Sequence, residues 1–191
     1  MGDGYLSTPA VFLVQVIFGL YVALVMIRFL LQLVRADFYN PVSQFVVKVT
    51  SPALNPLRRV IPGYAGVDFA SLLLAWVLKA IELSLVLAIS GFSFSVLGPL
   101  VWAIPELVTL VVNIVLIAIV IQAILSWVSP GGYNPAAVVL HSLSEPVLRP
   151  VRRLIPPISG IDVSPMIAIL GLILLKMLLL PPLKHLTSSP F

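Results

Sequence analysis

The chain has 191 residues, of which 60% are hydrophobic and only 9% are charged. Soluble domains are about 45–50% apolar and about 25% charged, so this chain has too little polar surface for a soluble fold and we expect a membrane protein. The absence of cysteine excludes disulfides, thiolate metal sites and cysteine nucleophiles. The net charge of +4 is informative through its distribution along the chain.

Four apolar segments are long enough to cross a membrane, because a helix of about 20 residues spans the roughly 30 Å hydrocarbon core. They run over about 11–34, 69–89, 107–127 and 161–180, and each is expected to be helical because lipid offers the backbone no hydrogen-bond partner. The apolar stretch 91–106 is interrupted by glycines and prolines. It predicts an outer hairpin or a re-entrant segment, and a fifth span is the competing interpretation.

Basic residues are concentrated in the two segments 35–68 and 128–160, and they are Arg35, Lys48, Arg58, Arg59, Arg149, Arg152 and Arg153. The stretch 91–106 and the first ten residues contain neither lysine nor arginine. The positive-inside rule therefore places both basic loops in the cytoplasm and both termini outside. A fifth span would send one basic loop outward, so the charges favour four spans.

The two halves of the sequence align without a gap: Tyr39-Asn40-Pro41 falls on Tyr133-Asn134-Pro135, a shift of 94 residues. The pattern P-x-L-x-P-x-R-R-x-I-P starts at Pro52 and again at Pro146, and a G-x-D follows at the same spacing in both halves. Since both loops are expected on one side, we predict parallel repeats related by an axis along the membrane normal. The first repeat covers residues 1–90 and the second repeat covers residues 107–191, with residues 91–106 as the connector between them.

Each basic loop also predicts a short surface helix. After each Asn-Pro, apolar residues recur at i, i+3, i+4 and i+7, which is one face of a helix; they are Val42, Phe45, Val46 and Val49, and Ala136, Val139, Leu140 and Leu143. An amphipathic helix on the inner membrane surface fits this pattern. The prolines that follow are expected to break the chain into a basic connector, and Asp68 and Asp162 to cap the next spans.

The duplicated motif, Pro52 to Pro62 and Pro146 to Pro156 with the G-x-D after each copy, resembles the YggT family, also called YlmG-like proteins, of bacterial and plastid membranes. The resemblance implies a two-repeat form in the bacterial inner membrane. It also implies links to osmotic stress and ion homeostasis, to cell division or nucleoid organisation, or to haem attachment to a b-type cytochrome. It implies no settled biochemical activity.

The arginine pairs Arg58-Arg59 and Arg152-Arg153 are the clearest candidate site. They are typical of a docking patch for anionic lipid head groups or an acidic partner. The alternative is that they only fix the topology. The flanking prolines favour docking, because a topology signal needs charge but no rigid shape.

A second candidate set consists of polar residues within the spans: Arg28, Lys79, Glu82, Asn113, Gln122 and Lys176. Such groups are costly in lipid and usually face the bundle interior. The repeat alignment places Glu82 and Lys176 at equal depth in the membrane, so we predict that these two side chains are in contact between the halves. Alternatively Glu82 pairs with Lys79 on its own helix and the lysines reach outward to the interface.

Three of these residues carry simpler expectations. Arg28 is near the cytoplasmic end of its span and is expected to extend toward water. Asn113 and Gln122 are expected to hold helices together.

No phosphate-binding glycine loop, metal motif or hydrolase motif is present, so we expect neither an enzyme nor a cofactor, metal site or nucleic-acid partner. The sequence favours a membrane organiser or assembly factor, acting in the envelope, in division or in cytochrome assembly. Its expected partners are anionic lipids and an unidentified membrane protein, and a second copy of the chain is a further candidate. The alternative is a transporter or channel-associated protein in osmotic and ion balance.

Overall fold

The computed structural model describes residues 3–64, 66–93, 95–128, 134–155 and 162–188. These ranges form helices α1 (Asp3–Leu33), α2 (Pro41–Val60), α3 (Phe69–Ile89), α4 (Leu97–Val128), α5 (Pro135–Leu154) and α6 (Ser164–Thr187). Four of the helices, α1, α3, α4 and α6, are long and apolar enough to span a membrane. The predicted all-α fold with four spans is confirmed.

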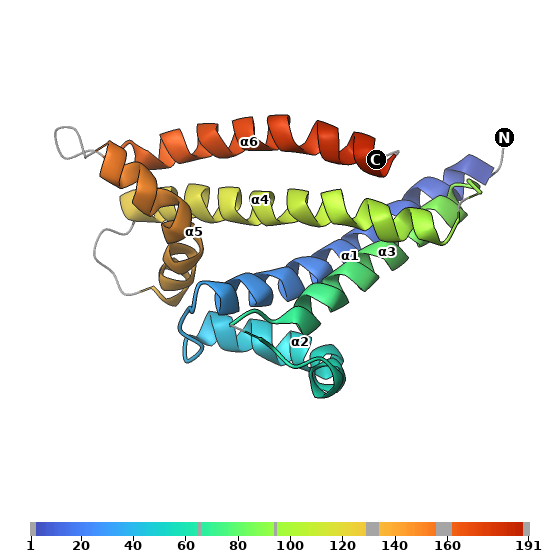
Figure 1. The fold of residues 1–191 in the computed structure, drawn as a ribbon, viewed down its shortest axis with the longest axis horizontal. Helices are drawn as coiled ribbons and strands as arrows, with labels where there is room; N and C mark the ends of the chain where they lie inside the picture. Colours follow the sequence, from blue (N-terminus) through green and yellow to red (C-terminus); the bar gives the residue numbers. More distant parts are fainter. Residues whose placement is uncertain (1–2, 65, 94, 129–133, 156–161, 189–191) are drawn as a thin grey trace.

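The two halves have the same arrangement (Figure 1). α1 packs against α3 and α4 against α6, while α2 and α5 lie at one end of these pairs and contact each other. α1 and α4 run in the same direction, and both termini lie at the end away from α2 and α5 (Figure 1). The repeats are therefore parallel, and both surface helices are at the same end, as predicted.

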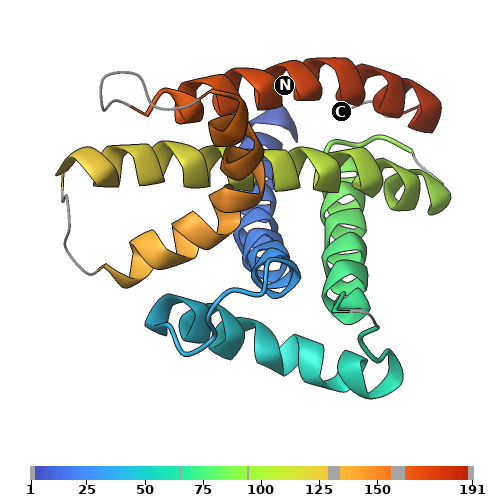
Figure 2. The same ribbon diagram turned by 60° about the vertical axis from the view of Figure 1, so that its left-hand side comes forward.

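The two pairs of spanning helices are inclined to each other, as Figure 2 shows. α4 packs against both α3 and α6, so it lies between the second span of each repeat. The outward faces of the spans carry large apolar side chains such as Phe12, Ile17 and Leu20, each more than 60% exposed. An apolar surface of this extent is suited to lipid contact rather than to water.

The surface helices begin as the sequence predicts. In α2 the Asn40 side chain accepts a hydrogen bond from the backbone N–H of Val42, and in α5 Asn134 accepts one from Ala136, both at 2.9 Å. A proline in the first turn favours the helical φ and needs no N–H partner there. Both segments form amphipathic helices, but of the predicted apolar positions only Val46, Val139 and Leu143 are buried, and Phe45 is exposed. The buried faces comprise Ser43, Val46, Thr50 and Leu54 in α2, and Val139, Leu143, Ser144 and Leu148 in α5.

The prolines of the repeat motif do not break these helices, so that prediction is wrong. Pro52 and Pro56 lie within α2, and Pro146 and Pro150 lie within α5. Each pair is spaced four residues apart on the exposed side of its helix. An internal proline leaves one carbonyl without its N–H donor, and hydration of that carbonyl on an exposed side lowers the cost.

The connector 91–106 is also corrected. α4 starts at Leu97, so residues 97–106 are the first turns of the third span rather than an outer hairpin, a re-entrant segment or a fifth span. Pro99 lies in the first turn, where no intrahelical N–H bond is lost, and Gly91 ends α3 with a φ of +76°. Parts of the second repeat motif, Tyr133, Pro156 and Gly160, lie outside the described residues.

Candidate functional site

The first arginine of each pair is bound within its own repeat. Arg58 donates hydrogen bonds to the carboxylate of Asp68 and, over 3.3 Å, to Oε1 of Gln32. Arg152 Nε donates to Asp162 Oδ2 over 3.0 Å, and its Nη1 donates to Glu145 over 2.9 Å. Arg58–Asp68 and Arg152–Asp162, which we call the arginine–aspartate clamps, therefore tie the end of each surface helix to the start of the next span.

Asp68 caps the span that it precedes, as predicted, whereas Asp162 is one residue before the N-cap of its span, which is Val163. Asp68 is the N-cap of α3, accepts the backbone N–H of Ser71 at 3.4 Å and also accepts the Ser71 hydroxyl. Asp162 accepts the backbone N–H of Ser164 at 2.9 Å at the start of α6. Both ends of each clamp are thus fixed by local structure, with the cationic end at a helix C-terminus, where the helix dipole favours positive charge.

The hydrogen bonds of the clamps determine the acidity of their carboxyl groups. Burial acts to raise the pKa of Asp68, but hydrogen bonds from Arg58 and Ser71 outweigh it and hold this pKa below its ordinary value. The pKa of Asp162 is lowered in the same way, against burial, by hydrogen bonds from Ser164 and the clamp arginine. Both aspartates therefore stay ionised at neutral pH.

The second arginine of each pair is exposed. Arg59 and Arg153 are both exposed, and neither side chain has a hydrogen bond or ion pair within the part of the chain that the structure describes. Lys48 on α2 and Arg149 on α5 are exposed as well. The structure thus separates each predicted docking pair into a clamped, half-buried arginine and an exposed one.

Arg28 does not extend toward water, contrary to the prediction. It is only 4% exposed, and its Nη1 donates to α2 at three points: Val47 O (3.2 Å), Thr50 Oγ1 (2.8 Å) and Ser51 Oγ (3.1 Å). α2 lies across the end of α1, so its oxygens take the place of the water that the guanidinium would otherwise need. Arg28 therefore holds the surface helix against the first span, and we call the Arg28–Thr50 contact the lock of the first repeat.

The second repeat has a related lock between α4 and α5. Gln122, which aligns with Arg28, accepts a hydrogen bond from Ser144, which aligns with Thr50. Gln122 Nε2 also lies 3.0 Å from Nδ1 of His141. Gln122 thus holds two helices together, as predicted, and both repeats fasten their surface helix at the same point.

The remaining intramembrane residues do not form the predicted Glu82–Lys176 contact. Glu82 pairs instead with Lys79 on α3 at 2.8 Å, which agrees with the local pairing of the alternative interpretation but not with lysines that reach outward. Lys176 on α6 donates to Asn113 on α4 at 2.9 Å, so Asn113 joins two helices as expected. Because α4 packs between α3 and α6, the equal depth of Glu82 and Lys176 does not bring them together.

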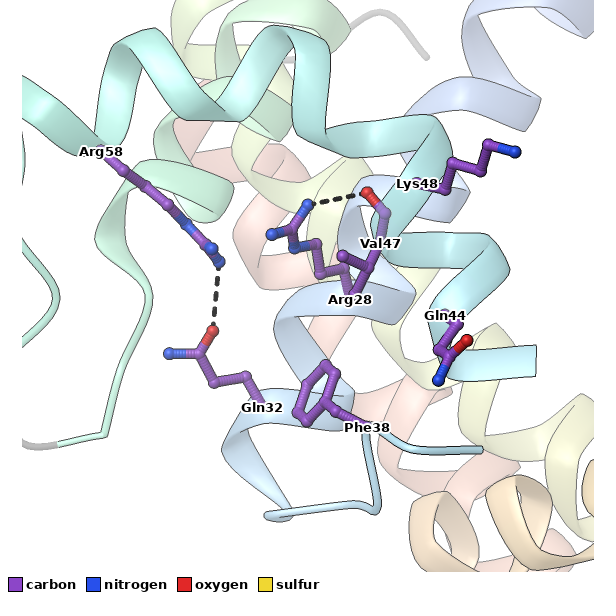
Figure 3. Close-up of a pocket in the computed structure, with 7 residues that line it drawn as sticks. All are labelled: Arg28, Gln32, Phe38, Gln44, Val47, Lys48 and Arg58. Carbon is purple, nitrogen blue, oxygen red and sulfur yellow. Dashed lines mark hydrogen bonds between the residues drawn. The ribbon is translucent and has the colours of Figure 1, made fainter. Parts of the chain in front are cut away.

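A pocket of about 420 Å³ lies between α1 and α2 (Figure 3). Its lining contains three cations and no carboxylate, and consists of Arg28, Gln32, Phe38, Gln44, Val47, Lys48 and Arg58. In Figure 3 the guanidinium groups of Arg28 and Arg58 point toward one another, whereas the Lys48 ammonium points away from them. In the second repeat, Gln122 and Ser142 stand at the positions of Arg28 and Lys48.

A smaller pocket of about 130 Å³ lies among α1, α3 and α4, where the two repeats meet. Polar residues from both repeats line it, including Lys79, Glu106, Thr109 and Asn113. Glu106 is also paired with Lys184 at 3.2 Å. Within the described ranges, no three His, Asp or Glu side chains gather closely enough to hold a metal ion.

Sequence reasoning missed the clamps and the locks, although the repeat contains a signal for each. The arginine and aspartate of a clamp are ten residues apart in both halves. The lock partners are 22 residues apart in both halves. Polar pairs that recur at one spacing in both copies are candidates for contact.

The duplicated architecture agrees with the comparisons. The family model described as CCB3/YggT matches residues 7–89 and again residues 101–183. The chain belongs to the CCB3/YggT family. The two matches are offset by the same 94 residues as the internal repeat, so each YggT match contains one complete clamp and one lock.

Relatives of similar length include an uncharacterised protein of Pseudomonas aeruginosa, 44% identical over 97% of this chain and 95% of the relative. The protein YggT of Escherichia coli K12 is 44% identical over 87% of this chain and 86% of its own. A Haemophilus influenzae protein is 35% identical over 90% of this chain and 91% of its own length. The names of these relatives assign no activity. No solved structure matches the chain.

Proposed function

We propose that this YggT-family protein is a non-enzymatic organiser or assembly factor of the bacterial inner membrane, which presents α2 and α5 to anionic lipids or an acidic partner. The observation that supports this most is that the two arginines of each pair differ in the same way. The first arginine is held in a clamp, and the second, Arg59 or Arg153, is exposed. A topology signal needs only charge near the membrane. A repeated geometry that fixes one arginine and leaves its neighbour exposed supports docking.

The proposed orientation has α2 and α5 in the cytoplasm and both termini outside. Its support is the charge difference between the two ends of the molecule. The segments that contain α2 and α5 carry seven lysines and arginines, whereas at the other end Lys184 is paired with Glu106. The positive-inside rule assigns the more basic end to the cytoplasm.

The expected strength of docking follows from the exposed cations. A basic residue near an anionic membrane contributes about 1 kcal/mol, and the attraction decays within a Debye length. Lys48, Arg59, Arg149 and Arg153 are exposed. Recruitment of anionic lipid is therefore expected to weaken as the salt concentration rises.

The test is to reconstitute the full chain in giant vesicles that contain labelled phosphatidylglycerol. We expect the label to concentrate around the wild-type protein, and Arg59→Gln/Arg153→Gln to remove much of this enrichment. Arg59→Lys/Arg153→Lys is the matched control, because it keeps the charge. Equal enrichment around the glutamine variant would contradict a role for these arginines.

A transporter or channel-associated role is the second candidate. It is supported by the 130 Å³ pocket, which has polar lining from Lys79, Glu106 and Asn113 at the boundary between the repeats. Transporters built from repeats bind their substrates at such boundaries. Ion flux into liposomes distinguishes the two functions: the organiser predicts flux equal to that of empty liposomes. Flux that Glu82→Gln abolishes would favour transport.

A further inference from the structure

We infer that the 420 Å³ pocket between α1 and α2 binds the phosphate group of one anionic membrane phospholipid, and that each chain has a single such site. This inference goes beyond the proposed function, because it uses the inward Arg28 and Arg58 rather than the exposed Arg59 and Arg153. It stands or falls independently of the vesicle experiment described above.

The donors of the two arginines are only partly used. All hydrogen bonds of Arg28 to the described residues leave from Nη1, so Nε and Nη2 are left for another acceptor. Arg58 uses Nη2 for both Asp68 and Gln32. Each guanidinium carries five N–H donors in a planar fork, and a phosphate oxygen is the acceptor that such forks match best.

The charges of the pocket also favour an anion. The guanidinium groups of Arg28 and Arg58 point toward one another (Figure 3), and like charges repel. Asp68 neutralises one of them through the clamp, and no carboxylate lines the pocket itself. A phosphate between the two guanidinium groups would convert this repulsion into two favourable ion pairs.

The position of the pocket favours a lipid over a soluble phosphate. Arg28 is five residues from the end of α1 at Leu33, which places it about 7 Å inside the end of the span at 1.5 Å per residue. The other wall is the amphipathic helix α2, which lies at the end of the spans (Figure 1). In a span that extends past the roughly 30 Å hydrocarbon core, this position falls near the lipid head groups. The exposed ring of Phe38 adds apolar contact beside the cations.

The second repeat lacks the same charge. Gln122 and Ser142 replace Arg28 and Lys48, so of the three pocket cations only the clamp arginine Arg152 remains. The lock is retained as Gln122–Ser144, but a neutral carboxamide does not offer a phosphate the charge of a guanidinium. One site per chain follows.

The experiment measures phosphatidylglycerol binding to the delipidated full chain in detergent by native mass spectrometry. We expect one tightly bound lipid per wild-type chain. Arg28→Gln/Thr50→Ser copies the Gln122–Ser144 lock of the second repeat and is expected to bind at least about tenfold more weakly, since a charge-assisted pair is lost. Lys184→Gln removes one positive charge at the opposite end of the molecule, outside the pocket and the docking arginines, and is expected to stay within about twofold of wild type.

A second pair of variants keeps the test decisive if Arg28→Gln/Thr50→Ser does not fold. Lys48→Glu and Arg149→Glu reverse one exposed charge each on α2 and α5. Only Lys48→Glu adds a carboxylate to the pocket lining, and we expect it to weaken binding at least about fivefold more than Arg149→Glu.

Three results would overturn the inference. One is equal affinity of the pocket variants and their controls. Another is saturation at two equivalent lipids per chain. The third is displacement of the lipid by millimolar inorganic phosphate, which would identify a soluble anion as the occupant.

Discussion

The two repeats share a scaffold but differ in its chemistry. In both, an asparagine starts the surface helix, and an arginine at its end clamps an aspartate ten residues later. That aspartate accepts a backbone N–H from the start of the next span. The copies differ at three places in the alignment. At the lock, Arg28 is replaced by Gln122; at the rim of the α1–α2 pocket, Lys48 is replaced by Ser142; and in the second span, Glu82 is replaced by Lys176.

This comparison distinguishes the contacts that both copies keep from those that differ between the copies. The clamps and caps set the angle between a surface helix and its spans, so both copies keep them. At the lock, an arginine that donates to three oxygens of α2 is replaced by a glutamine that accepts from one hydroxyl of α5. The surplus cations of the first repeat are therefore not explained by folding.

The largest expected effect tests whether the two clamps are equally strong. Asp68 is 3% exposed, whereas the Asp162 side chain is 37% exposed. Asp68→Ala removes a cap and a buried charge-assisted hydrogen bond and is expected to lower the free energy of unfolding by about 2–3 kcal/mol. Asp162→Ala is expected to cost about 1 kcal/mol. Reversible unfolding in mixed micelles measures both, and equal losses would contradict the ranking.

The next effect tests the pairing of the intramembrane charges. A double-mutant cycle of Lys79→Met and Glu82→Gln is expected to give a coupling energy of about 1–2 kcal/mol, because the two side chains are in contact. The cycle of Glu82→Gln and Lys176→Met is expected to be additive within about 0.5 kcal/mol, since α4 separates the two helices. Strong coupling in the second cycle would restore the contact predicted from the alignment.

A pH effect follows from the clamp carboxylates. The pKa values of Asp68 and Asp162 are lowered in the folded protein, so their contribution to stability is complete above the unfolded pKa of about 3.9 and is lost as the pH falls through the lower folded values. Stability should therefore decline below about pH 4. In the same unfolding assay, the unfolding free energy of Asp68→Ala/Asp162→Ala should depend less on pH. If its decline in acid were as large as that of wild type, groups other than the clamp carboxylates would be responsible.

The smallest effect concerns the locks. Arg28→Gln/Thr50→Ser gives the first repeat the lock of the second, so the helix contact is kept and we expect a loss of no more than about 1 kcal/mol of unfolding free energy. Arg28→Ala leaves Thr50 without its α1 partner and should cost more. If the two variants were equally unstable, the Gln122–Ser144 geometry would not be a substitute for the Arg28 lock.

Much of the fold could be predicted from sequence because it depends on periodicity and charge. The four spans, the surface helices with their Asn-Pro starts and the Asp68 cap all follow from local patterns. The internal prolines misled the prediction, because Pro52 and Pro56 lie on the exposed side of a continuous helix. The early start of α4 was missed because glycines and prolines in its first turns resemble a break.

The candidate site was less predictable because its contacts depend on how elements pack. The partner of Arg58 lies just before the next span, and the partners of Arg28 lie on α2, so neither contact follows from one helix alone. The Glu82–Lys176 prediction assumed that equal depth means contact, which fails because α4 lies between the two spans.

The central claim is that the two surface helices lie on the same, cytoplasmic side of the membrane. Because the chain contains no cysteine, Val60→Cys and Leu154→Cys can each serve as a unique label at the equivalent, exposed ends of α2 and α5. A membrane-impermeant maleimide should label both in inside-out vesicles and neither in intact spheroplasts, while Phe92→Cys at the opposite end should show the reverse. Labelling of Val60→Cys and Leu154→Cys from opposite sides would contradict the account.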